Sequence, residues 1–234
     1  MSRRVAGRQP SETLRRIVTS LRLRKGETLY LQDEHADCWY RMVAGAAREY
    51  ELTAQGTRRC IGFFLPGDTF GFNSGVSRAL AAEMLMDSTL ERYPRSIAES
   101  LARSDPDLRN HLRSLPLATE ARAESRRLAL DRLAAREKLA AFLLQIASRA
   151  GRNARLDFEL PMSRTDIAEY LDIAPETVSR SIRGLCREEI IALERQKLVR
   201  VLDLERLTAL GTTTLQAPTP FVAIRLAPLY VTIH

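Results

Sequence analysis

The chain has 234 residues, of which 45% are hydrophobic and 28% charged, and its formal net charge is +7. This length suits one large domain or two modest ones, with ample mass for a buried core. No run approaches the roughly 20 apolar residues that span a bilayer, and the basic residues 1–7 lack the apolar segment of a signal peptide. These features exclude a membrane-spanning class and predict a cytoplasmic protein.

Three widely spaced cysteines, Cys38, Cys60 and Cys186, provide neither a disulfide framework nor a CxxC metal pair, so we expect no metal site. The positive charge is unevenly distributed. Residues 1–30 hold eight Lys or Arg against two acids and residues 109–155 hold eleven against four, whereas residues 161–211 hold eight against nine. The basic surplus can flank an anionic partner such as DNA, or it can simply keep the protein soluble.

Residues 21–94 consist of short apolar stretches separated by turn residues. The stretches 39–43, 47–52 and 60–65 are rich in aromatic and β-branched residues, and residues 66–68 (Pro-Gly-Asp) are a strong turn signal. Three further glycines punctuate the segment: Gly26, Gly45 and Gly56. The pattern predicts a small antiparallel β-roll, which closes its sheet edges by wrapping.

The next part of the chain has helical patterns. Residues 105–107 (Asp-Pro-Asp) resemble a helix start with proline just inside it, and helical periodicity continues beyond Pro116 to about residue 135. A second helix is predicted over residues 136–150, with an apolar face made by Leu139, Phe142, Leu143 and Ile146. A short strand over residues 156–160 follows it.

Two short helices joined by a tight turn are predicted from residue 163 onward. Ser163 and Asp166 form a capping-box pattern, the turn falls at about residues 172–174, and Pro175 suits the first position of the second helix. At about 100° per residue, that second helix has an apolar side and an opposite polar side. The apolar side holds Val178, Ile182 and Leu185, and the polar side holds Glu176, Ser179, Arg180 and Arg183.

This polar side has the chemistry of a DNA-reading surface. Arginine can donate two hydrogen bonds to guanine, and a carboxylate can accept one from the amino group of cytosine, as in a major-groove recognition helix. From pattern alone, an ordinary amphipathic helix pair with a solvated polar side is the alternative. Residues 190–201 then predict two short strands around a polar turn, a β wing, and residues 203–210 a closing helix.

The motifs resemble those of the CRP/FNR superfamily of bacterial transcription regulators, in particular its FNR and FixK-like branches. The resemblance lies in Ser-Arg-x-Asp-Ile-Ala-x-Tyr-Leu at residues 163–171 and Glu-Thr-Val-Ser-Arg at residues 176–180. It extends to residues 63–68, 71–72 and 139–144, and so covers about residues 21–210. The resemblance implies a regulator rather than an enzyme, without catalytic residues.

The resemblance also implies an α+β fold with four parts. Residues 1–106 would form a sensory β-roll, a jelly roll like that of cyclic-nucleotide-binding domains, and residues 107–135 a long dimerisation helix. Residues 136–211 would form a winged helix-turn-helix domain. The fourth part, a tail over residues 212–234, departs from the family's pattern, and we assign it no role. The alternative for residues 107–135 is a single core helix of a monomer, because their apolar heptad pattern is interrupted by acidic residues.

The residues of the chain bear on three possible effectors: a cyclic nucleotide, an iron–sulfur cluster and haem. Cyclic-AMP-binding relatives carry a Gly-Glu pair for the ribose and an Arg-Ser or Arg-Ala pair for the phosphate. This chain has Phe72 after Gly71, and although Arg78-Ala79 is present, the glutamate is missing and the spacing is shortened, which argues against a cyclic-nucleotide pocket. An iron–sulfur cluster needs four cysteines, one more than the chain has. His35 and His111 remain open as haem ligands or as ordinary surface histidines.

The resemblance implies a homodimer that binds double-stranded DNA at a palindrome resembling TTGAT-N4-ATCAA and also contacts RNA polymerase as an activator of low-oxygen metabolism. The base-reading residues would be Glu176, Ser179 and Arg180. The backbone-binding residues would be Arg164, Thr165, Thr177, Arg183, Arg195 and Lys197. No cofactor is expected. The rival function is a sensor-regulator of the same architecture whose DNA binding is gated by haem, redox state or a small ligand.

Cys186 lies near the border between the apolar and polar sides of the second helix. Oxidation of its thiol to a sulfinic or sulfonic acid would place negative charge near DNA phosphates and weaken binding. A small buried filler is an equally good interpretation, because free cysteine often has that role.

Overall fold

The computed structural model describes residues 18–72, 75–104, 106, 109–110, 112, 133–150 and 157–212. The chain divides into two compact units, which are considered separately. Among the described residues, unit 1 comprises 18–52 and 63–112, and unit 2 comprises 53–62 and 133–212. No helix among these residues is long and apolar enough to cross a membrane.

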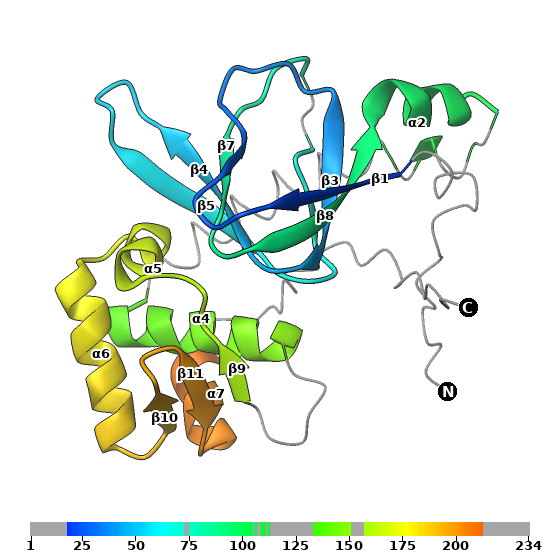
Figure 1. The fold of residues 1–234 in the computed structure, drawn as a ribbon. Helices are drawn as coiled ribbons and strands as arrows, with labels where there is room; N and C mark the ends of the chain where they lie inside the picture. Colours follow the sequence, from blue (N-terminus) through cyan, green and yellow to red (C-terminus); the bar gives the residue numbers. More distant parts are fainter. Residues whose placement is uncertain are drawn as a thin grey trace, which may run out of the picture. The chain divides into compact units, whose positions relative to one another are not determined.

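Eight antiparallel strands form the β-roll that the sequence predicts (Figure 1). The strands are β1 (Thr19–Leu23), β2 (Thr28–Tyr30), β3 (Cys38–Ala44), β4 (Ala47–Leu52), β5 (Arg58–Phe64), β6 (Thr69–Phe70), β7 (Ala81–Met84) and β8 (Ser88–Pro94). They make two four-stranded sheets, in the orders β1-β8-β3-β6 and β2-β7-β4-β5. The hydrophobic core of the roll includes Met42, Phe70, Met84 and Leu90.

The turn between β3 and β4 depends on glycine. Gly45 has a φ of +97°, and a Cβ there would lie 2.2 Å from the Ser88 side-chain oxygen. The same Ser88 hydroxyl accepts a hydrogen bond from the Ala46 backbone N–H at 3.2 Å. Only a residue without a side chain fits this left-handed turn against β8.

Helix α2 (Arg95–Leu101) was not predicted. It begins directly after Pro94, whose extended backbone ends β8, and no side chain caps it. Its buried residue Ala98 packs in a cluster with Trp39 and Tyr93 from the adjoining strands. This helix is fixed by tertiary packing rather than by a local signal, which is why the sequence pattern missed it.

Unit 2 contains the predicted helix-turn-helix and wing. The elements are α4 (Ala135–Ala150), β9 (Asp157–Glu159), α5 (Arg164–Leu171), α6 (Pro175–Arg187), β10 (Ile191–Glu194), β11 (Leu198–Val201) and α7 (Leu204–Thr212). The strands form a sheet in the order β10-β11-β9. The predicted apolar face of α4, Leu139, Phe142, Leu143 and Ile146, is fully buried. An α+β fold with a winged helix-turn-helix is therefore confirmed.

Parts of the predicted organisation lie outside the described residues. They include most of the dimerisation helix over 107–135, almost all of the tail over 212–234, and His111. The predicted boundaries between domains stay predictions.

Candidate nucleic-acid interface

Helix α5 begins as its capping box predicts. The Ser163 hydroxyl accepts a hydrogen bond from the Asp166 backbone N–H at 3.0 Å, and the Asp166 carboxylate accepts one from the Ser163 N–H at 2.8 Å. The helix ends at Asp172, which takes a left-handed φ of 52°. Ile167 and Leu171 bury the inner face. Both ends of α5 are thus set by local residues, which makes it a firm support for the next helix.

Helix α6 has the two sides that its sequence predicts. Pro175 occupies its first turn, and Val178, Ile182 and Leu185 are buried at 4% exposure or less. Glu176, Arg180 and Arg183 are exposed on the other side, and Thr177 and Ser179 are half-buried between them. The apolar side holds the helix on unit 2, so the polar side stays available to a partner.

The charged groups of that polar side are not engaged with each other. Among the described residues, the Glu176 carboxylate and the Arg180 guanidinium have no hydrogen-bond or ion-pair partner. Arg183 is different, because its Nε donates to the backbone carbonyl of Ser179 at 3.3 Å. Glu176 and Arg180 therefore keep all of their hydrogen-bonding capacity for a ligand, as base recognition requires.

The predicted backbone contacts come from two further elements. Thr165 is exposed in the first turn of α5, while Arg164 is half-buried and donates from Nη2 to the Gln196 carbonyl at 3.3 Å. In the wing, Arg195 and Lys197 are both exposed in the turn between β10 and β11. All the predicted DNA-contacting residues thus lie in one unit, on α5, α6 and the wing.

Cys186 is partly exposed on α6. Burial raises the pKa of its thiol, and the Arg164 cation and the Leu193 backbone N–H offset that rise only in part. A raised pKa favours the thiol over the reactive thiolate. The environment of Cys186 thus supports the filler interpretation more than the redox one, while leaving the sulfur within reach of solvent.

A set of ion pairs and hydrogen bonds at the C-terminal end of α6, which we call the brace, was not predicted from the sequence. Arg136, at the start of α4, pairs through both Nη atoms with the Glu188 carboxylate that follows α6, one of them at 2.7 Å. Arg206 on α7 donates to the Glu188 backbone carbonyl at 3.0 Å. The neighbouring Arg136 cation lowers the pKa of the Glu188 carboxyl. No local signal joins residues 52 positions apart, so only the fold could reveal this brace.

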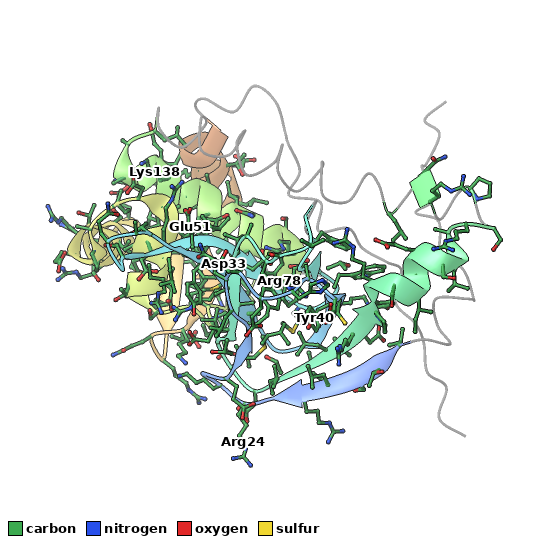
Figure 2. The ribbon with its side chains drawn as sticks, turned by 90° about the horizontal axis from the view of Figure 1, so that it is seen from above. Arg24, Asp33, Tyr40, Glu51, Arg78 and Lys138 are labelled. Atoms are coloured by element: carbon green, nitrogen blue, oxygen red, sulfur yellow. The ribbon has the colours of Figure 1, made fainter. Side chains whose placement is uncertain are left out.

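The interior of the roll is closed around Arg78, which is only 2% exposed. Its Nη1 and Nη2 donate to the carbonyls of Gly71 and Cys38, each at 2.5 Å, and its guanidinium carbon lies 4.2 Å from the centre of the Tyr30 ring. Figure 2 shows Arg78 beside Tyr40, whose ring centre is 5.7 Å away. Both Nη groups of Arg78 are thus bound to carbonyls of its own chain, and its Nε has no hydrogen-bond partner among the described residues.

Two residues beside Arg78 were also missed. Tyr30 donates a hydrogen bond from its hydroxyl to the buried Glu49 carboxyl. Burial raises the pKa of Glu49 above its ordinary value. A cavity of about 70 Å³ lies beside Gly71 and Cys38, the two residues whose carbonyls bind Arg78, and Trp39 and Phe72 also line it. The expectation that the roll binds no cyclic nucleotide stays a prediction.

The expectations for haem and metal ligands stay predictions, and only some of the candidate residues lie in the part of the chain that is described. His35 is exposed and pairs with Asp37 on the surface. No group of three His, Cys, Asp or Glu side chains there could hold a metal ion.

Comparisons with known proteins decide the family. A model described as a Crp-like helix-turn-helix domain matches residues 137–210, and one described as a cyclic nucleotide-binding domain matches residues 20–105. The nitrogen fixation regulation protein FixK of Rhizobium meliloti (strain 1021) is 35% identical over 185 residues, covering 79% of this chain and 83% of that protein. The chain belongs to the CRP/FNR family.

Two further members of the CRP/FNR family are similar to this chain over most of its length. The transcriptional activatory protein AadR of Rhodopseudomonas palustris is 34% identical over 202 residues, covering 86% of this chain and 84% of that protein. The solved structure of FixK2 from Bradyrhizobium japonicum matches with a TM-score of 0.78 at 36% identity, covering 83% of this chain and 97% of that chain. The chain is a DNA-binding transcription regulator of the FixK/FNR type and not an enzyme.

Proposed function

We propose that this regulator is a homodimeric activator that binds a palindrome resembling TTGAT-N4-ATCAA and controls low-oxygen metabolism in the cytoplasm. The observation that carries the proposal is the exposed side of α6, where Glu176 and Arg180 stand without partners among the described residues. Relatives named for nitrogen fixation regulation and for fumarate and nitrate reduction support the metabolic role.

In this proposal two recognition helices enter successive major grooves, about 34 Å apart along the DNA. Arg180 binds the guanine of each half-site, and Glu176 accepts from the amino groups of the complementary strand. Ser179 contacts a thymine or a phosphate. Arg164, Thr165, Thr177, Arg183, Arg195 and Lys197 bind phosphates, which fix the register of the protein on the duplex. RNA polymerase is the further partner of the bound dimer.

Specificity must then come from a few placed side chains. Residues 161–211 hold eight basic residues against nine acidic ones, so this segment has no net positive charge. Because non-specific DNA binding depends on neutralising phosphates, we expect weak binding to unrelated sequences. Base contacts would account for most of the discrimination.

The test is selection of bound DNA from a random pool by the full-length protein, with and without cyclic AMP. We expect enrichment of the TTGAT palindrome in both conditions, since the Arg78 cluster fills the roll. Enrichment only with cyclic AMP, or only after haem is added, would support the rival effector-gated function. Failure to enrich any palindrome would contradict the proposed site.

Cys186 provides a narrower alternative, in which oxidation weakens DNA binding. Its partial exposure and the nearby Arg164 cation favour this role, whereas the raised pKa of its thiol opposes it. The Cys186→Ser protein separates the two interpretations. If peroxide weakens DNA binding by the wild type and by this variant equally, Cys186 has no redox role.

A further inference from the structure

The turn of the wing has a strained backbone. Arg195 and Gln196 take φ values of 48° and 62°, so two consecutive residues with side chains lie in the left-handed region. The strand register pairs Glu194 with Leu198, so the loop has three residues, and the positive φ values of its first two are a conformation that Gly, Asn and Asp favour. Neither residue here is of that kind, so the turn needs support from outside its own sequence.

The support comes from Arg164 on α5. Its Nη2 donates to the Gln196 carbonyl at 3.3 Å, which fixes one of the two strained peptides. Within the turn, the Lys197 N–H donates to the Glu194 carbonyl at 3.1 Å, and the Lys197 carbonyl accepts from the Leu160 N–H at 2.8 Å. Arg164 is the only side chain among these contacts, and it reaches the turn from a different element.

Arg164 is placed for this role by its surroundings. It is half-buried, and burial lowers the pKa of its guanidinium while the nearby Cys186 raises it. Its side chain therefore lies against α6 and the wing rather than extending into solvent. A guanidinium has five N–H donors, so the bond to Gln196 leaves others for a DNA phosphate.

We propose that Arg164 is a positioning residue that holds the strained wing turn, and with it Arg195 and Lys197, in place beside the recognition helix. The expected effect of Arg164 on DNA binding rests on the proposed function, whereas its hydrogen bond to the wing turn does not. Arg164 thereby joins the three DNA-facing elements: it begins α5, lies beside Cys186 on α6 and binds the wing.

The test measures the wing without DNA. Hydrogen–deuterium exchange of the peptide covering residues 192–200 is compared in wild type, Arg164→Ala, Gln196→Gly and the double variant. Loss of one net hydrogen bond corresponds to roughly fivefold faster exchange, which we expect for Arg164→Ala. Because glycine takes a positive φ without strain, Gln196→Gly should restore slow exchange in the Arg164→Ala background. Thr165→Ala, the matched control on the same turn of α5, should leave the wing unchanged.

Unchanged wing exchange in Arg164→Ala, or no recovery in the double variant, would overturn the proposal. Affinity for the selected palindrome adds a second measurement. We expect Arg164→Ala to weaken binding roughly tenfold, with recovery of at least half of that loss on a logarithmic scale in the double variant. The two proposals can fail separately. If Arg164→Ala speeds hydrogen exchange in the wing but the wild-type protein binds no palindrome, Arg164 does hold the wing and only the proposed function is wrong.

Discussion

Arg180 and Arg78 are two arginines in opposite situations. Arg180 is exposed on α6 and has no partner among the described residues, while Arg78 is buried in the roll with two carbonyls and two aromatic rings around its guanidinium. A guanidinium whose donors are unused is available for a ligand. One whose Nη donors are bound to backbone carbonyls contributes to the packing of the roll instead.

The contrast separates the surface of α6 in unit 2 from the interior of the roll in unit 1. In unit 2 the charged residues of α6 face outward and the apolar ones hold the helix in place. In unit 1 the Nη donors of Arg78 bind backbone carbonyls and Tyr30 binds Glu49, while the buried Arg78 Nε has no hydrogen-bond partner among the described residues. Four variants probe the two situations, and their expected effects decrease in the order Arg78→Ala, Arg180→Ala, Gly71→Ala and Glu49→Gln.

Arg78→Ala should have the largest effect on stability. It removes the donor to the Gly71 and Cys38 carbonyls and leaves a cavity beneath the Tyr30 ring, for an expected loss of about 3–5 kcal/mol in the free energy of unfolding. Urea unfolding of the purified protein measures it. The exposed Arg22→Ala variant is the control and should change stability by less than about 0.5 kcal/mol. A similar small change for Arg78→Ala would contradict the structural role.

Arg180→Ala should weaken DNA binding and leave the stability of the protein unchanged. We expect a loss of about 1–3 kcal/mol of DNA-binding free energy per half-site and a relaxed preference at the guanine, with an unchanged free energy of unfolding. Fluorescence anisotropy with the palindrome and with guanine-substituted versions measures both. If the variant discriminates the guanine as well as wild type does, the assignment of Arg180 is wrong.

The helix-turn-helix and wing of unit 2 could be predicted well from the sequence, because the signals that define these elements are local. The capping box at Ser163, the proline at the start of α6 and the apolar positions Val178 and Ile182 each act within a few residues. The structure confirms these elements and the wing. Which of their side chains touch DNA stays a prediction, since that depends on a partner.

The closed interior of the roll could not be predicted in the same way. Glu49 and Arg78 are charged residues that the fold buries, and their contacts join strands and loops far apart in the chain. A single sequence shows a charged residue in a strand but not what lies across the sheet from it. Phe72 and the altered spacing argued against a nucleotide, but only the packing shows what fills the space.

Gly71→Ala tests how tightly the cluster is packed. Gly71 has a φ of +79°, and an added Cβ would lie 3.0 Å from Arg78 Nη1 and 3.2 Å from the Tyr40 ring. We expect a loss of about 1–2 kcal/mol in the free energy of unfolding. Gly56→Ala is the matched control, because its φ is +75° but nothing lies within 4 Å of the added Cβ. Equal losses in both variants would mean that backbone strain alone is responsible and that the cluster tolerates the extra carbon.

Glu49→Gln should give the smallest effect, and one that depends on pH. Burial raises the pKa of the Glu49 carboxyl above 4.5, although the hydrogen bond from Tyr30 partly offsets the rise. The folded state therefore holds this proton more tightly than the unfolded state does, so the stabilisation from protonated Glu49 is complete below about pH 4.5 and is lost as pH rises through the folded-state value. Glutamine mimics the protonated form at every pH.

The stability of Glu49→Gln relative to wild type should thus increase from pH 4.5 toward neutral pH. Urea unfolding at a series of pH values measures the difference, and the exposed Glu205→Gln variant should run parallel to wild type. A constant difference between Glu49→Gln and wild type would mean that the folded roll binds the Glu49 proton no more tightly than the unfolded chain does, so that Glu49 is charged in the folded roll at neutral pH. The charge of Arg78 would then be balanced by a buried carboxylate, and the roll would resemble a filled anion site more than a neutral core.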